Sequence, residues 1–142
     1  MKQLLSVMAI FLLSNVISAQ KSADRDLIKK IDTEVEKADH KQIYKEKGWG
    51  GNFEKTEVYY VNKTPILIVR QQKENTKSIN KPSNGGSADV SKTISAKFYI
   101  KDWAQNQFVR VGEIQNNKEK SAMSSDFAFN YDKKAIEDLI SK

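Results

Sequence analysis

Basic and aromatic side chains alternate along one segment of this sequence, in a spacing that favours binding over catalysis. Lys97, Tyr99 and Lys101 recur at every second position, which places them on one face if the segment is a β-strand. Arg110, in the next candidate strand, shares that wet face in our interpretation. Cations interleaved with aromatic rings are typical of surfaces that bind nucleic acid or other anionic polymers. We therefore predict a partner-binding surface there.

Trp49 is the fifth candidate for this surface. It stands among the three glycines of Gly48–Gly51, a segment that cannot continue a helix without a large entropic cost. A tryptophan in such a place either binds a partner or closes the edge of a core, and core packing is the commoner role of large aromatic residues. Both interpretations remain open at this stage.

The residue types of common catalytic and metal centres are scarce in this chain. His40 is the only histidine and there is no cysteine, so His/Cys zinc sites, thiol nucleophiles and disulfides are excluded. We interpret His40 as a polar residue near a helix end, since no serine or carboxylate stands at a diagnostic spacing from it. The carboxylates are scattered, and no glycine-rich phosphate loop precedes a helix. The sequence predicts no catalytic residue, no metal and no cofactor.

The N-terminus has the features of a secretory signal peptide. Lys2 is followed by the mostly apolar stretch 4–16, and Ala19 offers a small residue for cleavage before Gln20. The apolar stretch is shorter than the roughly 20 residues that a membrane span needs. We predict a signal peptide at 1–19, a single domain at 20–142 and a periplasmic or secreted location, with no transmembrane anchor after cleavage. Export and mixed charges argue against a nucleic-acid partner, although the formal net charge is +6.

The segment from Thr56 to Gln71 is expected to organise the fold as a β-hairpin. Runs 57–61 and 66–70 are rich in β-branched and aromatic residues, and the polar break 62–65 contains a proline. Alternation places Ile66 and Ile68 on one face and Leu67 and Val69 on the other, so both faces are apolar. This predicts a central strand pair with something covering part of the second face.

The remaining elements flank this hairpin. A charged helix is expected over 22–47, because its apolar residues follow the helical period. Segment 74–92 is polar and predicts a long mobile loop. Strands follow at 93–101 and 107–115, then a loop at 116–125, a short strand or packed lead-in at 127–131, and a last helix capped by Asp132. The predicted fold is α+β, with an antiparallel sheet of about four strands, formed by two hairpins, whose apolar side packs against an N-terminal and a C-terminal helix.

The tyrosine-rich run 57–63, the aliphatic run 66–69 and the strands around 96–101 and 108–111 resemble small exported α+β proteins of Bacteroidota-type bacteria. That resemblance implies a periplasmic or secreted domain and brings no activity with it. A looser fold-level likeness is to small periplasmic inhibitor and peptidase-propeptide-like domains.

We therefore expect an exported, non-enzymatic binding module for a protein or an anionic envelope polymer. One alternative is an inhibitor or immunity-type protein that blocks a secreted enzyme. Another is a hydrolase that uses scattered carboxylates around Trp49.

Overall fold

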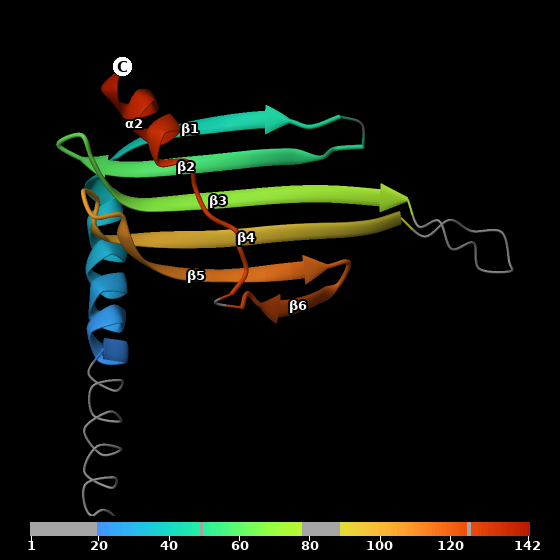
Figure 1. The fold of residues 1–142 in the computed structure, drawn as a ribbon, viewed down its shortest axis with the longest axis horizontal. Helices are drawn as coiled ribbons and strands as arrows, with labels where there is room; N and C mark the ends of the chain where they lie inside the picture. The colour runs from blue at the N-terminus through green and yellow to red at the C-terminus, as the bar shows by residue number, and fades with distance from the viewer. Residues whose placement is uncertain (1–19, 49, 78–88, 125) are drawn as a thin grey trace, which may run out of the picture.

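The described residues form one antiparallel sheet of six strands, arranged in the order in which they follow along the chain (Figure 1). The computed structural model describes residues 20–48, 50–77, 89–124 and 126–142. An antiparallel sheet flanked by helices agrees with the predicted α+β class. The prediction of about four strands is wrong, because two strands come from segments assigned on sequence to a helix and a loop. The predicted signal peptide at 1–19 lies outside the described residues.

The strands have unequal lengths, and the two longest lie in the middle of the sheet. They are β1 (Asp39–Glu46), β2 (Phe53–Val61), β3 (Thr64–Lys77), β4 (Asp89–Asp102), β5 (Gln107–Asn116) and β6 (Glu119–Ala122). The chain ends with helix α2 (Lys133–Ser141), and residues 20–34 form an N-terminal helix. No helix among these described segments is long and apolar enough to cross a membrane.

The N-terminal helix is shorter than the predicted helix 22–47. After residue 34 it tightens into the 3₁₀ turn η1 (Val35–Lys37), and Ala38 is already extended. The next eight residues pair with β2 as β1, from Asp39 opposite Tyr60 to Glu46 opposite Phe53. A neighbouring strand that supplies ladder hydrogen bonds can override helical periodicity in a short polar segment. His40 therefore lies in strand β1, three residues after η1 ends, and not inside the predicted helix 22–47.

The central hairpin is confirmed, with a tighter turn than expected. Asn62 and Lys63 have φ angles of 51° and 62°, the left-handed pair that a two-residue hairpin turn requires. A bulge opposite Tyr59 and Tyr60 leaves Ile66 as the extra residue. Ile66 consequently packs with Leu67 rather than sharing a face with Ile68.

The predicted loop at 74–92 is wrong at both ends. β3 continues to Lys77 and pairs with β4 from Asp89 onward, so Glu74 lies opposite Lys92. The end of β3 and the start of β4 are both polar, and their backbone groups are paired in a long ladder of hydrogen bonds. No local hydrophobic pattern predicts this pairing. Residues 78–88 lie outside the described part of the chain.

The second predicted loop, 116–125, also contains a strand. Asn117, at φ 52°, turns the chain after β5, and β6 pairs back with residues 113–116. Beyond β6 the chain crosses the sheet without regular secondary structure, which agrees with the packed lead-in and not with the strand at 127–131. Asp132 then caps α2 as predicted, accepting a hydrogen bond from the Ala135 N–H at 3.1 Å.

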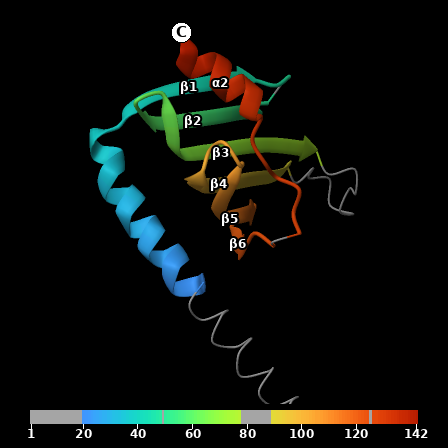
Figure 2. The same ribbon diagram turned by 60° about the vertical axis from the view of Figure 1, so that its left-hand side comes forward.

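Apolar residues fill two separate cores, one on each face of the sheet. Val58, Ile68 and Phe98 are fully buried on one face, beneath the C-terminal segment and α2. Leu67 and Tyr99 point to the other face, where they pack with Ile31 of the N-terminal helix. The prediction that both helices roof the same apolar side is therefore wrong. Figure 2 shows the N-terminal helix and α2 on different sides of the sheet.

We call these two sides the closed face and the helix face. The closed face carries the residues that share a side with Ile68, and the helix face carries those that share a side with Leu67.

Candidate binding surface

The N-terminal helix covers only one end of the helix face, because it crosses the strands instead of running along them (Figure 1). Its apolar contacts are concentrated on Leu67 and Tyr99. An α-helix is about 10 Å wide, whereas a 14-residue strand such as β3 is roughly 46 Å long at about 3.3 Å per residue. Much of the helix face is therefore left uncovered.

We call this uncovered part the open face, and the strand register gives its composition. Gln42, Glu57, Val69, Lys97 and Val111 form the row next to the helix, and Tyr44, Lys55, Gln71, Ser95 and Glu113 form the following row. The rows mix aliphatic, aromatic, amide, hydroxyl and charged side chains. A composition of this kind suits a surface that is wet when free and partly apolar when bound.

A shallow depression of about 370 Å³ lies in the open face between β3 and β5. Val69 and Val111 contribute apolar walls, and Gln71, Lys97 and Glu113 contribute polar groups. Val111 is 49% exposed, one of the largest apolar exposures among the described residues. Val111 is the fifth residue of its row, on β5, and together with Val69 it gives this depression an apolar lining.

Most charges on the open face are paired with one another. Glu57 Oε1 lies 3.0 Å from Lys55 Nζ and 3.6 Å from His40 Nε2. Glu113 lies 3.5 Å from Lys120 of β6. Lys97 has no ion pair within the described part of the chain and remains exposed. The charges of these two rows are therefore close to balanced, and Lys97 is the lysine in them that no described carboxylate neutralises.

Two stacked pairs of aromatic rings stand on β1 and β2. His40 stacks on Tyr59 with 4.7 Å between ring centroids, and Tyr44 stacks on Phe53 with 5.7 Å. Tyr44 is 51% exposed. The first pair joins opposite residues and the second joins diagonal neighbours across the two strands, which are the side-chain contacts that antiparallel pairing allows.

Two of the five residues proposed on sequence for partner binding are engaged with the N-terminal helix. Tyr99 is buried, and its hydroxyl donates a hydrogen bond to Asp32 at 3.2 Å. Burial, with the nearby Asp32 carboxylate and its hydrogen bond, raises the pKa of Tyr99 to about 12. Lys101 lies 2.6 Å from the Asp24 carboxylate. Both side chains hold the helix on the sheet.

Arg110 lies on the closed face, away from the other candidates. Its guanidinium donates hydrogen bonds to the carbonyls of Ser124, Phe127 and Phe129, at 3.0, 2.5 and 3.0 Å. These carbonyls belong to the irregular C-terminal segment, which has no strand partner to satisfy them. Arg110 is thus a structural residue in this fold.

Trp49 lies outside the described residues, and Lys97 is the one candidate that the described structure leaves exposed on the open face.

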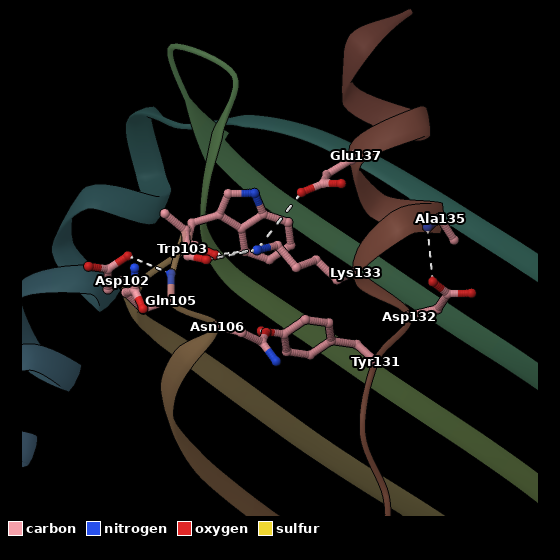
Figure 3. Close-up of polar contacts among 10 residues, drawn as sticks. Asp102, Trp103, Gln105, Asn106, Tyr131, Asp132, Lys133, Ala135 and Glu137 are labelled. Atoms are coloured by element: carbon pink, nitrogen blue, oxygen red, sulfur yellow. Dashed lines mark hydrogen bonds and ion pairs between the residues drawn. The ribbon is translucent and has the colours of Figure 1, made fainter.

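A second set of contacts on the closed face joins the β4–β5 turn to the start of α2, and its side chains are drawn in Figure 3. Lys133 donates to the carbonyls of Trp103 and Ala104 at 2.7 and 3.3 Å, and its ammonium lies 5.0 Å from the Trp103 ring centroid. The Tyr131 hydroxyl donates to Asn106 at 2.7 Å. The groups that meet here join the β4–β5 turn to the start of α2, so this cluster fastens the C-terminal segment.

Sequence reasoning missed the aromatic residues of β1 and β2 as surface candidates. Tyr44 was included in the predicted helix, and Phe53 lay outside the predicted hairpin. No period of two marks this segment, because residues 40–42 are all polar and Ile43 and Tyr44 are adjacent.

Neither a family model, nor a curated protein, nor a solved structure matches this chain. Across the described residues no group of three histidine, aspartate or glutamate side chains is gathered to hold a metal ion.

Proposed function

We propose that this chain is an exported, non-enzymatic binding module whose open face receives a protein or an envelope polymer. The observation that carries the proposal is the unequal covering of the sheet. One face is sealed by a C-terminal segment and a helix. The other keeps Tyr44 and Val111 about half exposed and contains a depression of about 370 Å³ between β3 and β5.

The charges of the open face favour a partner held by packing and hydrogen bonds over a partner held by charge attraction. Glu57 and Glu113 each pair with a lysine, so neither stands as an isolated acid or base. Of the lysines in the two rows of the open face, Lys97 is the one without an ion pair among the described residues. A partner held mainly by Coulomb attraction needs a cluster of like charges. This distribution of charges supports an uncharged or weakly charged partner. It gives no support to the anionic partner that we expected from the composition of the sequence.

The proposal is testable by thiol protection, because the chain contains no cysteine. Val111→Cys places a unique thiol on the open face, and Ala128→Cys places one at an exposed position of the C-terminal segment. Each variant is treated with a maleimide in the presence and absence of an envelope fraction from the source cells. We expect the envelope fraction to slow labelling at Val111→Cys several-fold and to leave Ala128→Cys unchanged. Equal rates at Val111→Cys with and without the fraction would contradict the proposal.

A further inference from the structure

A stripe of aromatic and hydrogen-bonding side chains runs along β1 and β2, at the rim of the open face. We define the ring stripe as His40, Gln42, Tyr44, Phe53, Glu57 and Tyr59. A stacked ring pair stands at each end of it. Tyr44 follows His40 by four positions along β1, which places these two residues about 13 Å apart at the rise of a β-strand.

Hydrogen-bonding groups fill the space between the two ring pairs. Gln42 is exposed and offers an amide donor and an amide acceptor, and it lies opposite Glu57 in the register. The Glu57 carboxylate contacts Lys55 at 3.0 Å, which offsets its charge and leaves further lone pairs to accept hydrogen bonds. The stripe is therefore aromatic, polar and aromatic along its length, with little net charge.

We propose that the ring stripe binds a neutral polysaccharide chain that lies along β1 and β2. The proposal rests on the binding function proposed for the open face and names its ligand class. The C–H faces of pyranose rings are apolar and pack on aromatic side chains, while their hydroxyl groups exchange hydrogen bonds with amides and carboxylates. A chain of sugar units can pack on the aromatic rings and exchange hydrogen bonds with the polar groups between them. Because the stripe lies at the rim of the open face, the polymer can continue beyond the protein.

Other occupants fit the stripe less well. The paired charge of Glu57 gives an anionic polymer no cluster of cations to follow. The depression of the open face lies on β3 to β5, so a small molecule would not be enclosed at the stripe. A protein strand that extended the sheet would pair with the outer edge of β1, where the exposed Asp39, Lys45 and Glu46 supply the charges that commonly blunt an edge.

Affinity electrophoresis of the full chain tests the proposal. The formal charge of +6 carries the protein toward the cathode in native gels near neutral pH, with or without dextran, galactomannan or a β-glucan in the matrix. We expect at least one polysaccharide to retard the protein in proportion to its concentration. Tyr44→Ala should weaken this retardation about tenfold, roughly the effect of losing one stacking ring. Tyr44→Phe, which keeps the ring, should retain most of it.

Val111→Ala is the matched control, since Val111 is equally exposed on the same face but lies outside the stripe. Absence of retardation of the unmodified chain in all three gels would overturn the proposal. Loss in Val111→Ala as large as in Tyr44→Ala would overturn it as well. If the envelope fraction protects Val111→Cys but none of the three polysaccharides retards the chain, the open-face function stands and the polysaccharide assignment fails.

Discussion

The closed face and the open face of one sheet differ in what holds them together. On the closed face Val58, Ile68 and Phe98 are fully buried, and cations from the sheet donate to the carbonyls of the segment that covers it. On the open face the side chains contact one another within the sheet, through ring stacking and ion pairs. This difference leads us to expect that the closed face contributes more to the stability of the fold than the open face, where we propose binding.

The largest expected effect comes from truncating the closed core. Phe98 is fully buried and makes edge-to-face contacts with Phe108 and Tyr131, at centroid distances of 5.3 and 5.0 Å. We expect Phe98→Ala to lower the free energy of unfolding by about 3 to 5 kcal/mol, because it leaves a cavity that the sheet cannot close. Denaturant unfolding monitored by tryptophan fluorescence measures the change.

Val111→Ala provides the comparison on the open face. Half of this side chain is already exposed, so we expect a change within about 0.5 kcal/mol, as for ordinary surface positions. If Val111→Ala lowered the free energy of unfolding nearly as much as Phe98→Ala, the two faces would contribute equally to stability. That result would contradict the difference between the closed face and the open face.

A smaller effect is expected from removing the cation that fastens the C-terminal segment. Arg110→Met keeps much of the apolar stem but leaves the carbonyls of Ser124, Phe127 and Phe129 without this donor. Lost hydrogen bonds to a charged group lead us to expect destabilisation of about 2 kcal/mol. Amide hydrogen exchange should also accelerate in residues 126–132 more than in β2 and β3. Lys97→Met, on the open face, should change neither measurement.

The smallest effect at neutral pH concerns the covered end of the helix face. The pKa of Tyr99 is raised from 10.0 to about 12, mainly by burial and then by the Asp32 carboxylate. The protonated phenol is therefore favoured by folding, and its contribution is fully present below pH 10 and is lost between pH 10 and about 12. We expect stability to fall across that window, and Tyr99→Phe to make the fall shallower.

Tyr131 must be included in that experiment, because burial raises its pKa to about 12 as well. Tyr131→Phe alone and together with Tyr99→Phe separates the two contributions in an alkaline titration of tyrosinate absorbance. If Tyr99→Phe left both the titration and the stability profile unaltered, Tyr99 would be ionising as freely as an exposed tyrosine, and the helix would not be sealing that end of the sheet.

Patterns that are repeated locally allowed part of the fold to be predicted. The alternation of Ile94, Ala96, Phe98 and Ile100 identified a strand with one buried face, and all four residues are buried. Asp132 was recognised as a helix cap from its residue type and position, and its hydrogen bond is present. Leu27, Ile28 and Ile31 were recognised as an apolar helix stripe, and they pack together against the sheet. In each case the physical cause lies within a few residues of chain.

The candidate surface was harder to predict, because it depends on which elements cover which face. Lys97, Tyr99 and Arg110 looked equivalent along the chain, yet the register sends Arg110 to the closed face and the helix covers Tyr99. The half-exposed ring of Tyr44 and the partly buried ring of Phe53 were missed for the same reason. Their segment became an edge strand only because β2 lies beside it.

The sequence by itself determined the α+β composition, the central hairpin and the last helix, since side-chain periodicity and capping are local. The tertiary structure alone decided that the first helix ends before β1, that polar segments such as 119–122 join the sheet, and that the two helices cover opposite faces. Strand pairing supplies ladder hydrogen bonds from residues distant in sequence. That non-local stabilisation leaves no periodic signal in the segment that receives it.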